Sequence, residues 1–187
     1  MSDSNDPQSP KRVLTLLFDG VEEIEAVAPI DLLRRAQIEV TTASLGTERA
    51  VAGRSQIEIL ADAMIGDVRT SEFDALFLPG GPGVLKLIGN PSIEELISYF
   101  ARSGKLIAAI CAAPKVLASM GLLEERLATS HAAIRSALPL PSDEPIVISE
   151  GIISSQGAGT AVPFALELIR QLVGSTIADE VAASIHA

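Results

Sequence analysis

Short, almost wholly apolar runs separated by amphipathic segments limit how this chain can fold more than any other feature. The runs lie at 12–18, 74–78 and 105–110, and apolar residues recur at helical spacing in 23–36 and 92–102. An apolar run without alternation is typical of a strand buried on both faces, and parallel strands need a long crossover, usually a helix. The pattern therefore predicts an α/β fold in which a doubly wound, mostly parallel sheet is sandwiched by helices.

Further elements follow from weaker local patterns. Ser92 and Glu95 have the spacing of a capping box at the start of the second helix. Gly121 and Gly174 each follow an apolar helical segment, as glycine often does just past a helix end. The other expected elements are strands at 39–44 and 127–130, a hairpin or edge strand within 47–60, a hairpin at 146–149 and 152–155, and helices at 113–120, at 160–173 and at the C-terminus.

The length of 187 residues predicts one domain. Residues 1–10 are polar and acidic with two prolines, and they lack the basic start and apolar stretch of a secretory signal. We expect a disordered tail at 1–10 and a single domain at 11–187. No apolar run reaches the roughly 18 residues that a membrane span needs, so we expect no membrane partner.

Charge and cysteine usage exclude several classes of function. The formal net charge of -10 repels phosphate backbones, which argues against a nucleic-acid partner. The single cysteine cannot form an internal disulfide, and a free thiol suits the reducing cytoplasm. One cysteine and two histidines offer no metal-ligand spacing. We expect neither a metal nor a nucleotide cofactor.

Several loops are predicted to leave the sheet at the same edge. In open α/β sheets, ligands bind at the carboxyl ends of the strands. The loops that follow the predicted strands there are 20–25, 79–83 and 111–114, and the shorter strands would add His131 and 156–159. One cleft is expected to collect all of them.

Cys111 lies between a buried strand and a helix, and Pro114 is acceptable in the first turn of that helix. A thiol facing a helix N-terminus is stabilised as a thiolate, so its pKa is expected below the usual value of about 8.5. Small Ala112 and Ala113 allow the sharp turn seen in nucleophile elbows. The alternative is that Cys111 is a small core residue, since free cysteine is often buried.

Glu25 is the expected carboxyl partner of the thiol because it lies within an otherwise apolar helical face. Burial would keep it protonated, and a protonated carboxyl can donate a hydrogen bond to a thiolate. Pro29 would leave the carbonyl of residue 25 without its helical partner. The alternative is that Glu22, Glu23 and Glu25 only favour a helix N-terminus.

Other candidates have equally ordinary alternatives. His131 is a candidate acid or base, although a lone histidine is more often structural, and His186 is expected in solvent near the C-terminus. Gly80 and Gly81 can offer backbone N–H groups to an oxyanion, although glycine pairs after strands are usually turns.

Taken together, these segments resemble the ThiJ/PfpI superfamily, and within it the DJ-one branch with its bacterial relatives. The resemblance runs nearly end to end and keeps the family's order and spacing. It is carried by DGVEEIEAVAPIDLLRRA, DALFLPGGPG, GKLIAAICAAPKVLA, the ATSH segment and ISSQGAGTAVPFALELI.

The resemblance implies a flavodoxin-like, class I glutamine amidotransferase-like fold. It implies that Cys111 is the nucleophile, Glu25 its protonated hydrogen-bond partner and His131 the nearby histidine. Gly80 and Gly81 match the family's oxyanion positions.

The resemblance also bears on the residues around this centre. Ala112 adds its backbone N–H to the oxyanion positions and stands where the peptidase branch has histidine, which disfavours peptidase activity. Arg54 or Ser55 falls near a family arginine at the rim. The family commonly forms homodimers through one face of the first helix.

Two functions are then expected. The first is a cysteine-dependent enzyme that acts on reactive dicarbonyls, such as methylglyoxal, or on their early adducts, like a glutathione-independent glyoxalase or a deglycase. The second is an oxidative-stress sensor or redox-regulated chaperone that works through oxidation of Cys111 without turnover.

Overall fold

A seven-stranded sheet occupies the middle of the computed structural model, which describes residues 9–187. Most of the predicted tail at 1–10 therefore lies outside the described residues. The strand order is β10-β11-β7-β6-β1-β2-β5. All neighbours are parallel except β10 and β11. The strands are β1 (Arg12–Leu17), β2 (Glu39–Ser44), β5 (Ala63–Met64), β6 (Ala75–Leu78), β7 (Leu106–Ile110), β10 (Ile146–Ser149) and β11 (Ile152–Ser155).

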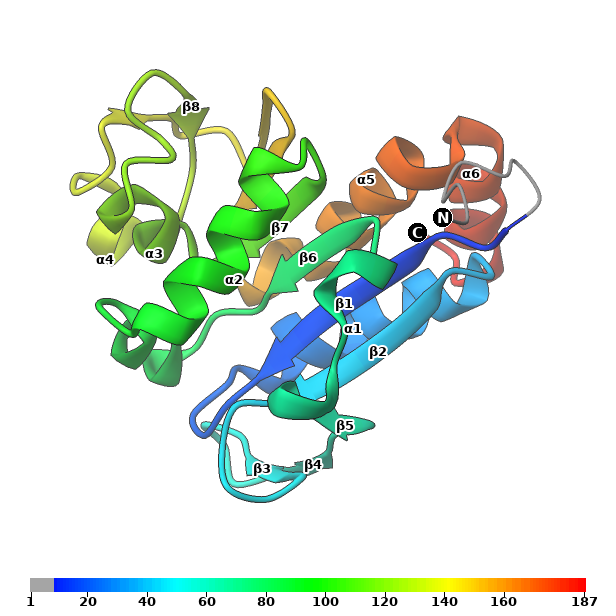
Figure 1. Cartoon of the computed structure of the whole chain (residues 1–187). Coiled ribbons are helices and arrows are strands. Elements are labelled where there is room, and N and C mark those ends of the chain that lie inside the picture. The colour runs from blue at the N-terminus through cyan, green and yellow to red at the C-terminus, as the bar shows by residue number, and fades with distance from the viewer. Residues whose placement is uncertain (1–8) are drawn as a thin grey trace.

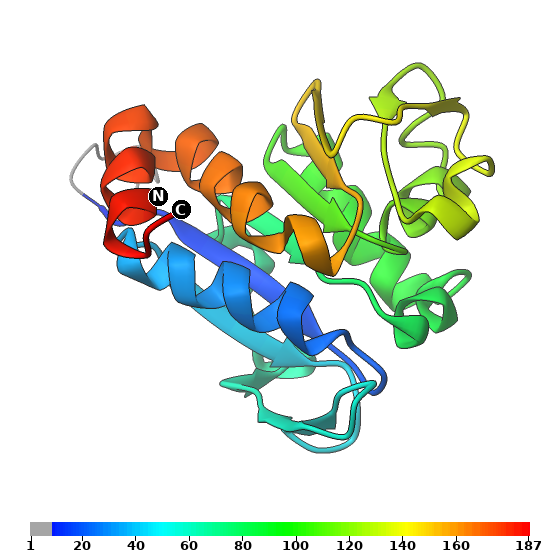
Figure 2. The same cartoon turned by 180° about the vertical axis from the view of Figure 1, so that it is seen from behind.

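Helices cover both faces of this sheet, as predicted. Figure 1 shows α2 and α3 on the near face, and Figure 2 shows α1, α5 and α6 on the other. The doubly wound α/β sandwich expected from the apolar runs is therefore confirmed. The helices are α1 (Glu23–Arg35), α2 (Pro91–Arg102), α3 (Pro114–Ser119), α4 (Ala132–Arg135), α5 (Ala161–Val173) and α6 (Ser175–Ser184).

The apolar runs form the core between the two helical layers. Leu14, Leu16 and Leu17 of β1 have no exposed surface. Phe77 of β6 packs against Phe164 of α5 with ring centroids 5.7 Å apart, which joins the sheet to its helical layer. Burying each such side chain contributes roughly 1.5–3 kcal/mol. The burial of both faces explains why these strands do not alternate in sequence.

The start of α2 differs from the prediction. The capping box of Ser92 and Glu95 is wrong, because the helix begins at Pro91 and its cap is Asn90. The Asn90 side chain accepts hydrogen bonds from the N–H groups of Ser92 (3.1 Å) and Ile93 (3.4 Å). Proline suits the first helical position because its missing N–H has no intrahelical partner there.

Two short strand pairs lie outside the main sheet. The segment predicted as a hairpin or edge strand is an antiparallel hairpin of β3 (Ala50–Ala52) and β4 (Glu58–Leu60). The short strand expected at 127–130 is β8 (Leu127–Ala128), which pairs in parallel with β9 (Leu140–Pro141). Across residues 9–187, no helix is both long and apolar enough to cross a membrane.

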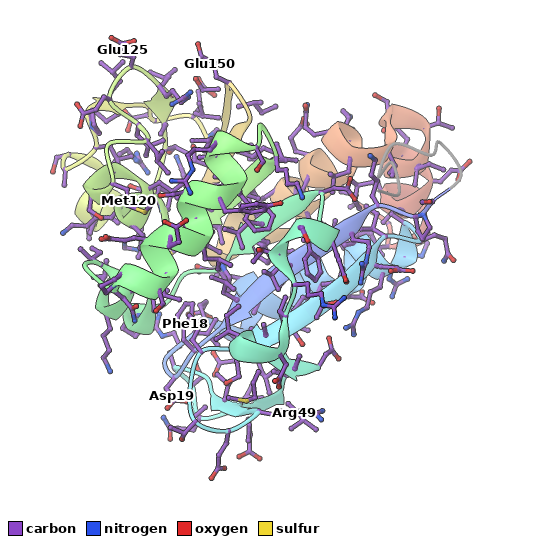
Figure 3. All side chains as sticks on the ribbon, in the orientation of Figure 1. Phe18, Asp19, Arg49, Met120, Glu125 and Glu150 are labelled. Atoms are coloured by element: carbon purple, nitrogen blue, oxygen red, sulfur yellow. The ribbon has the colours of Figure 1, made fainter. Side chains whose placement is uncertain are left out.

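The sheet reverses its winding direction between β6 and β1. The chain passes from β1 outward to β2 and from β6 to β7 in the opposite direction. Crevices at such points bind ligands at the carboxyl ends of the strands. In Figure 3, Asp19 after β1 and Glu150 before β11 lie at opposite ends of the molecule, and Asp19 marks the carboxyl end. The candidate site is expected at that end.

Candidate functional site

Cys111 lies on the sharp turn between β7 and α3. Its φ of 64° is in the left-handed region, which is strained for a residue with a side chain. The Cys111 N–H donates to the carbonyl of Ser155 (2.9 Å), and its own carbonyl accepts from the N–H of His131 (2.8 Å). The side chain is half-buried. Two backbone hydrogen bonds thus hold the strained turn that presents the sulfur.

Glu25 lies in the first turn of α1 and is only 2% exposed. Burial raises its pKa to about 7, and the negative charge of Glu22 adds to the rise. Interactions with the Cys111 thiol and with the N–H groups of Gly80 and Ala158 partly lower the pKa again. Its Oε2 is buried without a hydrogen-bond partner among the described residues. The carboxyl is therefore far easier to protonate than an exposed glutamate.

The pKa of Cys111 moves opposite to the sequence-based expectation. Burial, the charge of Glu25 and a hydrogen bond to Glu25 raise it to about 12. The N–H groups of Gly81 and Ala112 lower it, but they do not outweigh the first three effects. The prediction of a lowered pKa from the helix start is thus wrong, because the sulfur is desolvated beside a carboxylate.

Two glycines fit the backbone tightly around this pair. A Cβ at Gly80 would collide with the Glu25 carboxyl and the Cys111 side chain. Gly81 has a φ of 99°, and a Cβ there would collide with the backbone of Gly20. The N–H of Gly80 acts on Glu25, whereas those of Gly81 and Ala112 act on the sulfur. The arrangement favours Gly81 and Ala112 as the oxyanion donors.

His131 is exposed and caps the short helix α4. Its Nδ1 accepts a hydrogen bond from the N–H of Ala133 (3.3 Å), which leaves the proton of the neutral ring on Nε2. Its backbone N–H binds the carbonyl of Cys111. His131 is therefore hydrogen-bonded to the turn that carries Cys111 and borders the same pocket.

Arg54, rather than Ser55, occupies the rim of the site. The Arg54 guanidinium pairs with Glu22 at 3.0 Å. The Ser55 N–H instead donates to Glu23 Oε1 (2.7 Å). Burial acts to raise the pKa of Glu23, but hydrogen bonds from the backbone N–H groups of Ser55 and Ile57 help to lower it below its usual value. The hydrogen bond to Glu23 thus connects the hairpin loop to α1, and Arg54 borders the pocket.

A pocket of about 270 Å³ opens beside the sulfur and collects the predicted loops, with one residue or more from each. The sequence argument did not single out Pro82 or Ile134, and it assigned Glu22 only a helix-start role. Ile134 lies three residues beyond His131, a spacing that places two helical residues on one face. The pocket is lined by Glu22, Glu25, Arg54, Gly81, Pro82, Cys111, Ala112, His131, Ile134 and Ala158.

Metal ligation has no evident place in this arrangement. Within the part of the chain that the structure describes, no group of three or more histidine, cysteine, aspartate or glutamate side chains is placed to hold a metal ion.

A cysteine on a strained strand-to-helix turn, beside a buried glutamate at the switch point of a parallel sheet, defines a class of α/β proteins whose turn has the backbone geometry of a nucleophile elbow. The chain belongs to the DJ-1/PfpI family, whose sequence model matches residues 11–171. This membership confirms the resemblance seen in the sequence segments.

Individual relatives cover nearly the whole chain. It is 37% identical to protein dj-1beta of Drosophila melanogaster over 92% of its length and 95% of the fly protein. It is 37% identical to the glutathione-independent glyoxalase DJR-1.2 of Caenorhabditis elegans, over 83% of this chain and 85% of the worm protein. The solved structure of oxidized DJ-1 of Toxoplasma gondii superposes with a TM-score of 0.90 at 34% identity, covering 94% of this chain and 97% of that one.

Proposed function

We propose that this protein is a cysteine-dependent enzyme that converts small reactive dicarbonyls, such as methylglyoxal, or their early adducts. The observation that carries the proposal is the pairing of buried Glu25 with half-buried Cys111 at the wall of a pocket of about 270 Å³. The pair offers a nucleophile and a proton carrier in one place. The naming of a worm relative as a glutathione-independent glyoxalase supports the same activity.

The first step is addition of the Cys111 sulfur to the aldehyde carbon. The thiol proton passes to Glu25, the carbon–sulfur bond forms, and the aldehyde oxygen becomes an oxyanion. The N–H groups of Gly81 and Ala112 stabilise this oxyanion. Protonation of the oxygen by Glu25 gives a hemithioacetal, and the carboxyl has returned to its starting charge.

The second step moves a hydrogen from the first carbon to the second. Glu25 or His131 removes the proton from the hemithioacetal carbon, and the ketone oxygen takes up a proton, which gives an enediol. The neighbouring carbon then takes up a proton while the hydroxyl on the first carbon loses one. The first carbon is now a thioester and the second a hydroxyl-bearing carbon. Water cleaves the carbon–sulfur bond and releases lactate and the thiol. Methylglyoxal plus water gives lactate and a proton, so no external oxidant or reductant is consumed.

Lactate formation from methylglyoxal by the purified protein tests this proposal. Cys111→Ser is expected to abolish turnover, and Glu25→Gln to lower it by about 10²-fold or more because it removes the proton carrier. Arg102→Gln, a change on α2 away from the pocket, serves as a control of unchanged rate. Undiminished turnover in both Cys111→Ser and Glu25→Gln would contradict the proposal.

A second candidate function is oxidative sensing, which includes a redox-regulated chaperone. Peroxide would oxidise the Cys111 thiol to the sulfenic and then the sulfinic acid, and each step reduces one peroxide molecule to water. The buried carboxyl of Glu25 favours this outcome, because its retained proton can be donated to a sulfinate oxygen. The solved relative from Toxoplasma gondii is itself described as oxidized.

Mass spectrometry of the intact protein after mild peroxide separates the two functions. Sensing predicts two added oxygens on the wild type and none on Cys111→Ser. It also predicts fewer sulfinic products in Glu25→Gln, because the stabilising donor is lost. Rapid methylglyoxal turnover without oxygen uptake under matched conditions would favour the enzyme.

We also propose that residues 11–187 form one domain and that the protein assembles as a cytoplasmic homodimer. Two apolar side chains of α1, Ile24 and Val27, are 56% and 48% exposed. Such neighbouring apolar side chains on an exposed helix suit a covered interface. Val27→Glu is therefore expected to shift the sedimentation coefficient to that of a monomer, and an unchanged coefficient would contradict this interface.

A further inference from the structure

A second pocket of about 340 Å³ lies against the one that holds Cys111. His131 and Ala158 border both of them. Gly157, which lines the second pocket, is also close to the reactive pair: a Cβ there would lie 3.8 Å from the Cys111 sulfur and 3.5 Å from Glu25 Oε1. The absence of a side chain at Gly157 thus leaves space between the sulfur and this side pocket.

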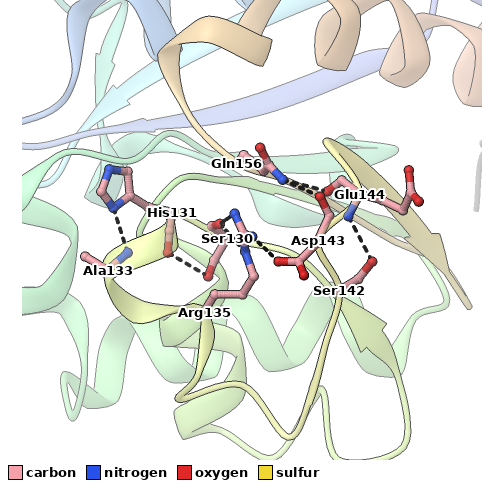
Figure 4. Close-up of polar contacts among 8 residues, drawn as sticks. All are labelled: Ser130, His131, Ala133, Arg135, Ser142, Asp143, Glu144 and Gln156. Carbon is pink, nitrogen blue, oxygen red and sulfur yellow. Dashed lines mark hydrogen bonds and ion pairs between the residues drawn. The ribbon is translucent and has the colours of Figure 1, made fainter.

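Arg135 is the one permanently charged side chain among the described residues that line the side pocket. Its Nε and Nη2 donate to the carbonyl of Ser130 at 3.1 and 3.0 Å. Figure 4 shows the guanidinium between Ser130 and Asp143, one turn of chain beyond His131. Two hydrogen bonds to one carbonyl fix the plane of the guanidinium, so a ligand that binds it does not have to order this side chain.

The carboxylate that now pairs with Arg135 is itself in solvent. Arg135 Nη1 pairs with Asp143, whose side chain is 95% exposed, whereas the Arg135 side chain is only 17% exposed. Gln156 holds the Asp143 loop through backbone carbonyls, those of Asp143 (2.7 Å) and Glu144 (3.2 Å). The Asp143 side chain can therefore turn into water while its backbone stays in place. An ion pair with so exposed a partner is weak and open to exchange.

We propose that the side pocket binds a carboxylate carried by the substrate, and that this carboxylate replaces Asp143 on Arg135. The substrate class is then a dicarbonyl, or a dicarbonyl adduct, with its aldehyde at Cys111 and an anionic group at the far end. This inference rests on the proposed function. It adds a specificity-determining residue, Arg135, that acts on the part of the substrate that does not react.

Two matched substrates test the proposal. 4-Carboxyphenylglyoxal carries a carboxylate opposite the dicarbonyl, and 4-carbamoylphenylglyoxal has the same shape without the charge. The wild type is expected to show a kcat/KM about tenfold higher for the carboxylate, as a charge-assisted hydrogen-bond pair supplies. A general disturbance of the site changes kcat/KM equally for both substrates, so it cancels in the ratio of the two kcat/KM values.

Three variants locate the effect. Arg135→Gln is expected to bring the ratio close to one. Asp143→Asn is expected to raise it, because it removes the competing carboxylate. Arg102→Gln makes the same change in net charge on α2, away from both pockets, and is expected to leave the ratio at the wild-type value.

A binding measurement keeps the inference separate from turnover. Calorimetric titration of Cys111→Ser with 4-carboxymandelate and 4-carbamoylmandelate is expected to show the same tenfold preference, lost when Arg135→Gln is added. If the wild type turns over both glyoxals with a kcat/KM ratio near one, the carboxylate site is contradicted and the proposed enzymatic function still stands. No turnover of any dicarbonyl overturns the proposed function, and the mandelate titration then decides the carboxylate site by itself.

Discussion

Glu25 and Cys111 titrate as one buried pair. Burial raises the pKa of Glu25 to about 7 and that of Cys111 to about 12, and each group shifts the pKa of the other. Between these values the pair therefore carries one negative charge and one proton. The N–H groups of Gly81 and Ala112 lower the pKa of the thiol without outweighing its burial and the charge of Glu25, so the proton lies mainly on sulfur. In the proposed mechanism the thiolate forms by transfer of this proton to the Glu25 carboxylate.

The first prediction concerns the pH dependence of Cys111 alkylation. In the wild type, the rate of reaction with iodoacetamide is expected to rise with a midpoint near pH 7 and then level off, because the pair loses its first proton there. In Glu25→Gln this step disappears, and the midpoint moves to a higher pH that lies below about 12, because the thiol stays desolvated but no longer faces the carboxylate charge. Peptide mass spectrometry across the pH range measures both curves. Identical midpoints would show that the two groups titrate independently.

The second prediction concerns stability. The pKa of Glu25 rises from 4.5 to about 7 on folding, so its contribution to stability is complete below pH 4.5 and is lost as the pH rises through 7. Relative to Glu25→Gln, the wild type is expected to lose up to about 3 kcal/mol of unfolding free energy over this range. Urea unfolding at pH 4.5 and pH 8 measures the difference. A constant gap between the two proteins would contradict the raised pKa.

The sequence predicts which residues come together in the site, because their positions follow from the general geometry of parallel sheets. Apolar runs such as Val13–Leu17 identify parallel strands, and the carboxyl ends of parallel strands share one edge. Cys111, Glu25 and His131 meet for this reason, although they are far apart in the chain.

Features that depend on packing could not be predicted. The pKa of Cys111 is set by its burial and by the distance to a carboxylate, and neither is encoded in local sequence. Arg54 reaches the rim because the hairpin of β3 and β4 docks on the chain through a bridge between Val21 and Gly53. The sequence does not locate the start of α2 because Asn90 and Ser92 are both good capping residues.

The third prediction decides between these two caps. Asn90→Ala is expected to lower the unfolding free energy by about 1 kcal/mol, since the N–H groups of Ser92 and Ile93 lose their acceptor. Ser92→Ala is expected to change it by less than about 0.5 kcal/mol, because its hydroxyl caps nothing. Chemical denaturation of the two variants gives the comparison, and a larger loss in Ser92→Ala would favour the cap predicted from sequence.

The fourth prediction uses Gly80, which packs closely against the side chains of both Glu25 and Cys111. A methyl group at this position has no room, so Gly80→Ala must displace the carboxyl, the sulfur or both. We expect a loss of about 1–3 kcal/mol in unfolding free energy, as is usual for overpacking. We also expect loss of the alkylation step near pH 7, because the shared proton depends on contact between the two groups. Gly66→Ala is the matched control, since nothing lies within 4 Å of the added methyl group there. A Gly80→Ala protein that is less stable but keeps the step near pH 7 would show that the pair tolerates displacement, and the model of one proton shared by contact would then be wrong.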